Sequence, residues 1–182
     1  MRLFAAIYPD EPMKNALCAA ISRLQAAALG GSFTRLQNLH LTLAFIGETT
    51  RLQPACRAVQ GITAAPFPLT LGDAGCFKRP GGDICWLGPR QSAALAQLQR
   101  QLTRRLADEG FMLEPHPFTP HFTLGRRVVL PPGFDWTGLQ PSAPITMTVS
   151  RICLMQSLQG GGGQVYTEIA AKELMGGSVN GV

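Results

Sequence analysis

The chain has 182 residues, of which 46% are hydrophobic and 15% are charged. This composition is typical of a globular protein and excludes a disordered or low-complexity chain. The length suits one domain, which we expect over residues 1–175, followed by a loose glycine-rich tail over residues 176–182. The formal net charge of +5 favours anionic ligands, although an ordinary basic surface gives the same charge.

Cysteines and apolar stretches indicate the compartment. The five cysteines are scattered and include no Cys-x-x-Cys pair, so a disulfide framework is not expected. The apolar run over residues 2–8 is too short for a secretory signal or a membrane span. We therefore expect a cytoplasmic protein without a membrane segment. We also expect a monomer, because no feature of the sequence indicates an interface.

The first elements in chain order are a strand and an amphipathic helix. Residues 2–8 lack helix signals and predict a buried strand. Asp10 is a suitable N-cap for the helix that follows, and Gly30 and Gly31 are expected to end it. The apolar positions of this helix recur at spacings of three and four residues, at Met13, Leu17, Ile21, Leu24 and Ala28.

A strand and a shorter helix come next. Residues 39–46 predict a strand, and Thr49 or Thr50 is expected to cap the second helix. The apolar face of that helix should carry Leu52, Cys56 and Val59.

The second half of the chain begins with a hairpin. Its arms are residues 67–77 and 84–87, because the Pro80-Gly81-Gly82 segment between them is a turn signal. A long helix follows, ends at Gly110, and carries an apolar stripe of Leu95, Leu98, Leu102 and Leu106. Further strands are expected over residues 121–126, 144–156 and 164–170.

Two short segments match each other, His40-Leu41-Thr42-Leu43 and His121-Phe122-Thr123-Leu124. Each follows a helix that is expected to end at a glycine, since Gly30 precedes the first histidine by 10 residues and Gly110 precedes the second by 11. This faint internal repeat predicts two related lobes that face one cleft, with the two histidines close together.

Strand alternation gives the motif its geometry. Side chains two residues apart lie on the same face of a strand, so His40 and Thr42 share one face, as do His121 and Thr123. One such motif alone would most often be a hydrogen-bonded histidine at a strand end. Zinc binding is the other alternative, and it fits poorly because no cysteine pair or helical histidine spacing accompanies the motif.

Two histidines suit the cleavage of a phosphodiester without a metal ion. Near neutral pH one imidazole can remove a proton from water while the other protonates the departing alkoxide. The hydroxyls of Thr42 and Thr123 can donate hydrogen bonds to the non-bridging phosphate oxygens. The paired motif therefore predicts a metal-independent phosphoesterase that needs no cofactor.

Arg126 is the cation nearest to the second motif, and a guanidinium suits bidentate phosphate binding. Strict alternation, however, sends Arg126 to the face opposite His121. Three interpretations remain open: Gly125 introduces a bulge, Arg126 acts from the end of the strand, or Arg126 is an ordinary surface charge.

The paired His-x-Thr-x motifs resemble those of the 2H phosphoesterase superfamily. A closer resemblance is to the RNA 2',3'-cyclic phosphodiesterases, also called LigT-like proteins or 2'-5' RNA ligases. Three segments carry it: Arg2-Leu3-Phe4-Ala5-Ala6-Ile7, Asn38-Leu39-His40-Leu41-Thr42-Leu43, and Pro120-His121-Phe122-Thr123-Leu124-Gly125-Arg126.

The resemblance implies an α+β fold with two pseudo-symmetric lobes of mostly antiparallel sheet, helices on the outside and a central cleft. It implies hydrolysis of RNA or nucleoside 2',3'-cyclic phosphate ends to 2'-phosphates, possible reversal as 2'-5' ligation, and RNA ends or cyclic nucleotides as partners. In this family His40 would be the acid and His121 the base. The substrate-binding residues would be Thr42, Thr123, Arg126 and Phe45, with Phe4 also bordering the nucleotide.

Two other functions stay open on the sequence. A related enzyme could use the same pair of histidines on another cyclic phosphate or on a 2'-5' linkage. A non-catalytic RNA-binding module would bind RNA even without both histidines. An ATP-driven ligase is disfavoured, because the chain has no Gly-x-x-x-x-Gly-Lys-Ser/Thr phosphate loop.

Overall fold

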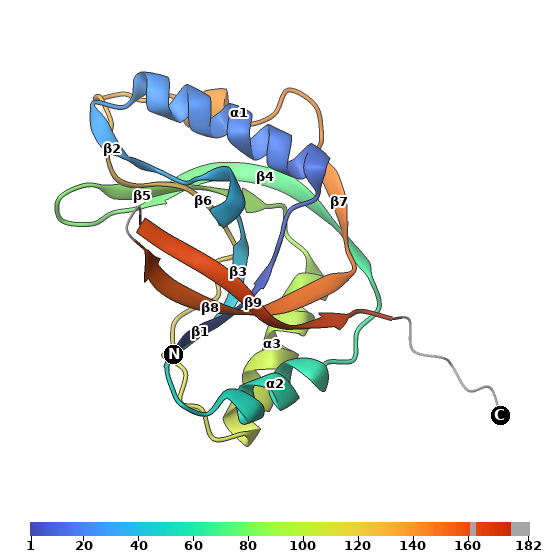
Figure 1. The fold of residues 1–182 in the computed structure, drawn as a ribbon. Helices are drawn as coiled ribbons and strands as arrows, with labels where there is room; N and C mark the ends of the chain where they lie inside the picture. The colour runs from blue at the N-terminus through green and yellow to red at the C-terminus, as the bar shows by residue number, and fades with distance from the viewer. Residues whose placement is uncertain (161–162, 176–182) are drawn as a thin grey trace.

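The computed structural model describes residues 1–160 and 163–175 (Figure 1). Helices and strands are mixed along the chain. In order they are β1 (Arg2–Ile7), α1 (Glu11–Ala27), β2 (Gly30–Phe33), the 3-10 turn η1 (Leu36–Asn38), β3 (Leu41–Glu48), α2 (Leu52–Gln60), β4 (Phe67–Phe77), β5 (Asp83–Pro89), α3 (Ala93–Asp108), β6 (Phe122–Val129), the 3-10 turn η2 (Trp136–Leu139), β7 (Thr146–Val149), β8 (Arg151–Gly160) and β9 (Gly163–Glu173). The predicted tail over residues 176–182 lies outside the described residues.

All strand pairs described are antiparallel, and they join in the order β7-β4-β5-β6-β3-β1-β8-β9, with β2 paired to β6. The middle of this order is its weakest point. There β6 and β3 are joined by one pair of residues, Leu41 and Phe122. We call this junction the seam. It divides the sheet into a β6 half, with β2, β4, β5 and β7, and a β3 half, with β1, β8 and β9.

The helices lie on the outside, as Figure 1 shows, with α1 at one end of the molecule and α2 and α3 at the other. Helix α1 follows β1 in the sequence but packs on β2, β6 and β7 of the opposite half. Helix α2 packs on β8 and β9, while α3 packs on α2, β3 and β4. The two halves are therefore built from interleaved parts of the chain.

The helix predictions from apolar spacing are confirmed for α1 and α3. The Asp10 carboxylate accepts a hydrogen bond of 3.0 Å from the backbone N–H of Met13, so Asp10 is the N-cap. The four leucines of α3 are at most 1% exposed. Burying each leucine contributes about 1.5–3 kcal/mol, so this stripe fixes the helix on the sheet.

The prediction for the start of α2 is wrong. Its N-cap is Arg51, without a side-chain capping bond, while the Thr49 hydroxyl accepts a bond from the Arg51 N–H. The Arg51 guanidinium instead donates to the carbonyls of Glu109 and Gly110, just after the end of α3. Leu52 and Cys56 are half-buried, and the buried face of α2 is Ala55, Ala58 and Val59. Small residues fit here because α2 packs closely on α3 and the sheet.

Two boundaries near the sheet also differ from the predictions. Residues 144–156 form two strands instead of one, because β7 pairs with β4 while β8 pairs with β1, on opposite sides of the seam. Gly110, with φ of +80°, follows the end of α3, as predicted. Gly30 instead opens β2, and α1 is capped by Ala28. Of the two predicted helix ends at glycine, the one at Gly110 is confirmed and the one at Gly30 is wrong.

Candidate active site

The two motif histidines lie at the seam. His40 immediately precedes β3 and His121 immediately precedes β6, one residue before each strand begins. The next residues, Leu41 and Phe122, pair with each other and are fully buried. Because this pairing is antiparallel, extending its register by one residue brings His40 beside Thr123 and His121 beside Thr42. The seam thus brings the two motifs together.

Both imidazoles are held in the same way. The Nδ1 atom of His40 lies 2.7 Å from the carbonyl oxygen of Asn38, and that of His121 lies 2.8 Å from the carbonyl oxygen of Thr119. A carbonyl only accepts, so each Nδ1 carries a hydrogen and donates it. In the neutral ring the Nε2 atom then has a free lone pair, which is the form that a general base requires.

Aromatic rings pack against each histidine from the flanking strands. The His40 ring lies 5.0 Å from the Phe4 ring of β1 and 5.1 Å from the Tyr166 ring of β9. The His121 ring lies 4.9 Å from the Phe77 ring of β4 and 6.3 Å from the Trp86 ring of β5. The sequence analysis missed Tyr166, Phe77 and Trp86. The sequence shows each of them only as an aromatic residue in or near a predicted strand, and this alone does not predict contact with a histidine.

Burial lowers the proton affinity of both histidines. Burial is the main cause that lowers the pKa of His40 from 6.5 to about 4; the bond to Asn38 opposes the shift, and the positive charges of Arg126 and His121 add to it. The pKa of His121 is lowered first by burial and then by Arg126, against the bond to Thr119. Without a ligand both imidazoles are therefore mostly neutral near pH 7.

A bulge in β6 places Arg126. Thr123 pairs with Trp86 and Gly125 pairs with Cys85, so β6 has one residue more than β5 over this step. A Cβ on Gly125 would lie 2.8 Å from the Val128 side chain, so glycine is required where the strand bends. The extra residue reverses the alternation of the side chains. The predicted bulge at Gly125 is therefore present, and the binding of substrate by Arg126 stays a prediction.

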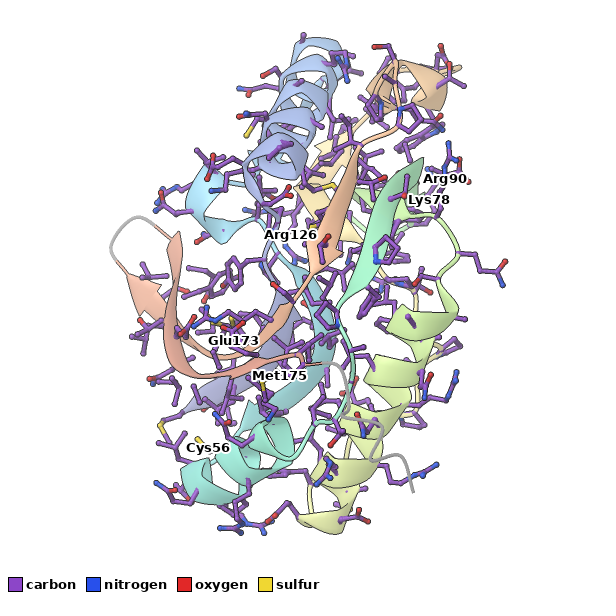
Figure 2. All side chains as sticks on the ribbon, turned by 90° about the vertical axis from the view of Figure 1, so that its right-hand side faces the viewer. Cys56, Lys78, Arg90, Arg126, Glu173 and Met175 are labelled. Carbon is purple, nitrogen blue, oxygen red and sulfur yellow. The ribbon has the colours of Figure 1, made fainter. Side chains whose placement is uncertain are left out.

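Arg126 and His40 line the same cavity, which has a volume of about 280 Å³. In Figure 2 Arg126 lies between the α1 end of the molecule and the β8–β9 hairpin. The full lining is Ser32, Phe33, Thr34, Arg35, Asn38, His40, Thr123, Arg126, Gly163, Gln164 and Tyr166. The lining takes residues from both halves of the sheet, but Thr42 and His121 are not part of it.

The remaining predicted site residues lie near His40. Thr42 is half-buried in β3 and pairs with Ala6 of β1. Phe45 is 61% exposed, and its ring lies 6.2 Å from the ring of Phe4, which is only 2% exposed. Phe45 is therefore available to a ligand, whereas Phe4 belongs to the apolar packing behind His40.

Among the described residues, 1–160 and 163–175, no three histidine, cysteine, aspartate or glutamate side chains gather in a group that could hold a metal ion. No helix among them is long and apolar enough to cross a membrane.

Comparison with known proteins gives a consistent result. Residues 13–161 match the family model of the 2'-5' RNA ligase superfamily. The RNA 2',3'-cyclic phosphodiesterase of Thermotoga maritima is 30% identical over an alignment of 189 positions, which covers 98% of each chain. The protein of the same name from Escherichia coli K12 is 41% identical over 108 residues, which cover 55% of this chain and 60% of that one.

Solved structures agree with the sequence comparison. E. coli LigT in its apo form superposes with a TM-score of 0.76 at 31% identity, covering 96% of this chain and 98% of LigT. TT0787 of Thermus thermophilus has the same fold, with a TM-score of 0.81 at 24% identity, covering 97% of this chain and 100% of that one. The predicted α+β fold and the family resemblance are confirmed. The chain belongs to the 2'-5' RNA ligase superfamily.

Proposed function

We propose that this protein hydrolyses RNA or nucleoside 2',3'-cyclic phosphate ends to 2'-phosphates, with His40 and His121 as the acid and base. One observation carries the proposal: two imidazoles, each held at Nδ1 by a backbone carbonyl, flank the seam where two neighbouring strands begin. Relatives that share 30% and 41% of their residues over the matched stretches are named RNA 2',3'-cyclic phosphodiesterases.

The reaction needs two proton transfers at phosphorus. His121 takes a proton from water, whose oxygen forms a bond to phosphorus. The bond between phosphorus and the ribose 3'-oxygen breaks, and His40 donates a proton to that oxygen. The product keeps the phosphate on the 2'-oxygen. This division of roles follows the family resemblance, since the two imidazoles have the same bonding in this structure.

Charge stabilisation comes from the side chains around the histidines. The Thr42 and Thr123 hydroxyls donate to the non-bridging phosphate oxygens, and Arg126 binds them with its guanidinium. Phosphate binding also changes the histidines, because the anion offsets the Arg126 charge that lowers both pKa values. The bound substrate thus raises the proton affinity of the imidazole that must act as the acid.

Phe45 contacts the base of the terminal nucleotide in this proposal. Its ring is exposed and lies next to Phe4, which in turn packs on His40. An exposed aromatic ring stabilises a stacked base by about 1–3 kcal/mol and tolerates any base. The ring therefore increases affinity without selecting the sequence of the RNA end.

The test is incubation with adenosine 2',3'-cyclic phosphate in EDTA, with identification of the product isomer by chromatography. We expect adenosine 2'-phosphate as the product. The 3'-isomer would contradict the assigned leaving group. Loss of activity in EDTA, with recovery on adding a divalent cation, would contradict a metal-independent mechanism.

The family description favours a second reaction at the same site, 2'-5' ligation. An RNA hydroxyl would then replace water as the group that attacks phosphorus, without other changes in the proton transfers. Incubating an RNA that ends in a 2',3'-cyclic phosphate with an RNA that begins with a 5'-hydroxyl tests it. A joined product sensitive to the histidine substitutions supports ligation. RNA binding without either reaction would instead indicate a non-catalytic binding module.

A further inference from the structure

Arg126 lies between two irregular points of β6. The first is the bulge at Gly125. The second lies between Gly125 and Val128, which pair with Cys85 and Asp83, so that three steps along β6 face two along β5. The first bulge turns the Arg126 side chain away from the core, and the second returns Val128, which is 1% exposed, to the core. The two bulges together place one exposed arginine within a buried row.

The extra residue of the second bulge is Arg127. On the edge toward β2, residues 126–129 face residues 30–32, so three steps along β6 again face two. The extra residue lies within 126–127 relative to β5 and within 127–128 relative to β2, and Arg127 is common to both. Among the described residues other than glycine, it is also the one with a positive φ, of +52°. This left-handed backbone is disfavoured for arginine, because its Cβ comes too close to the following carbonyl oxygen.

Two glycines contact the backbone beside this bulge, one on each edge of β6. A Cβ on Gly82, in the turn before β5, would lie 2.5 Å from the carbonyl carbon of Arg127. A Cβ on Gly31 of β2 would lie 2.9 Å from the Cα atom of Val128. Neither distance leaves room for a side chain, and both glycines have a positive φ, of +120° and +141°. We call Gly31 and Gly82 the glycine pair. Backbone therefore packs on backbone at both edges of the bulge.

The bulge sets the direction of Arg126. The Ser32 hydroxyl donates a hydrogen bond of 3.2 Å to the carbonyl oxygen of Arg126, which fixes the peptide before the extra residue. The Arg126 side chain lines the cavity beside His40, and its charge acts on both His40 and His121. The Arg127 side chain, in contrast, is exposed and does not line that cavity. The backbone of Arg127, and not its charge, is therefore the part that bears on the site.

We propose that Arg127 is a positioning residue: its left-handed backbone, packed between the glycine pair, directs the Arg126 guanidinium to the phosphate between the two histidines. This proposal rests on the proposed function. A strained conformation persists only where its surroundings hold it, and here it fixes a phosphate donor before the substrate arrives. If residue 127 left this conformation, Val128 could stay in the core only if residue 126 turned instead. The guanidinium would then move away from the phosphate.

The experiment compares three substitutions that all remove the charge of Arg127. Asparagine and glycine accept a positive φ, whereas valine, which is branched at Cβ, does not. Arg127→Val should lower kcat on adenosine 2',3'-cyclic phosphate by about 10² fold, as a misplaced catalytic group does. It should also raise the pKa of both histidines in NMR titrations, because the Arg126 charge lowers both. Arg127→Asn and Arg127→Gly should keep kcat and both titrations close to those of the wild type.

A double variant separates positioning from a merely structural effect. In an Arg126→Ala background, Arg127→Val should lower kcat no further, because the guanidinium that it misplaces is gone. An equal loss in both backgrounds would overturn the proposal, as would a loss in Arg127→Asn and Arg127→Gly as large as that in Arg127→Val.

Two further measurements keep the test decisive. If Arg127→Val does not fold, Arg127→Leu, whose Cβ is not branched, should show the same changes to a smaller extent. The histidine titrations test the positioning of Arg126 even if the wild-type protein does not hydrolyse the cyclic substrate, a result that would contradict the proposed function instead. Wild-type titrations in both the valine and the leucine variant would overturn the positioning role.

Discussion

The β3 half and the β6 half present their histidines with the same bond and different surroundings. Both Nδ1 atoms donate to the carbonyl two residues earlier. Around His40, however, the rings of Phe4, Tyr166 and Tyr8 gather from β1, β9 and the end of β1. The greater burial lowers its pKa to about 4. The repeated motif thus sets position and bonding, while neighbouring strands set proton affinity.

A second difference concerns what holds each half in place. The Asn38 side chain donates a hydrogen bond of 2.9 Å to the backbone oxygen of Gln164 in β9, while its own carbonyl holds His40. The Gln164 side chain in turn bonds to Ser157 and Gln159 of β8. Among the described residues, the Thr119 side chain makes no such bond on the other half. His40 is therefore linked to the β8–β9 hairpin by the hydrogen bond of the Asn38 side chain, and His121 has no equivalent hydrogen bond among the described residues.

The largest effect should come from removing either imidazole. His40→Ala and His121→Ala should each lower kcat by about 10² to 10⁴ fold, the usual contribution of a general acid or base. The measurement is hydrolysis of adenosine 2',3'-cyclic phosphate. His116→Ala is the control, because this third histidine is exposed and pairs with Glu114. Near-normal turnover in either motif variant would refute the two-histidine mechanism.

Removing Arg126 should affect both halves at once. Arg126→Ala should lower kcat by about 10² to 10³ fold, as loss of a donor to the transition state does. It should also raise the pKa of His40 and of His121, because its charge lowers both. Histidine NMR titrations measure this shift, with Arg79→Ala as the control. Unchanged titrations would show that Arg126 does not face the imidazoles.

The pH dependence of kcat/KM should reveal the unequal histidines. Burial lowers both pKa values below the ordinary 6.5, that of His40 to about 4, so each histidine gains its proton only in acid. Between the two protonations the pair of histidines holds one proton, which is the state that acid-base catalysis needs. The optimum of kcat/KM should therefore lie on the acidic side of pH 6.5. Activity should fall as pH rises and the last proton leaves, and fall again toward pH 4. An optimum above pH 7 would contradict the burial argument.

The smallest effect should come from the Asn38 side chain. Asn38→Asp keeps the carbonyl that holds His40 but removes the donor to Gln164. Backbone amides at the start of β9 should then exchange with deuterium about five- to tenfold faster, as expected for one lost hydrogen bond. Gln37→Ala, an exposed neighbour in η1, is the control. Equal exchange in the two variants would mean that this bond does not hold the hairpin.

The sequence was sufficient for the parts of the site that depend on local order. Alternation and the repeated motif predicted that His40 and His121 lie together, and apolar spacing predicted α1 and α3. The aromatic neighbours were out of reach, because Tyr166 meets His40 only through the order β3-β1-β8-β9. Arg126 depended on a bulge, whose position follows from the packing of Gly125 on Val128 and not from alternation.

The seam also decides how rigid the spacing of the histidines is. The two halves of the sheet share one residue pair, Leu41 and Phe122, at the place where the imidazoles are mounted. A junction of one pair resists rotation much less than a full strand ladder does. We therefore expect that rotation about this junction would change the distance between the two Nε2 atoms. A substrate that contacts both imidazoles would then fix the distance between them. Rigid compounds of graded length that bridge both imidazoles would measure how far this distance can change.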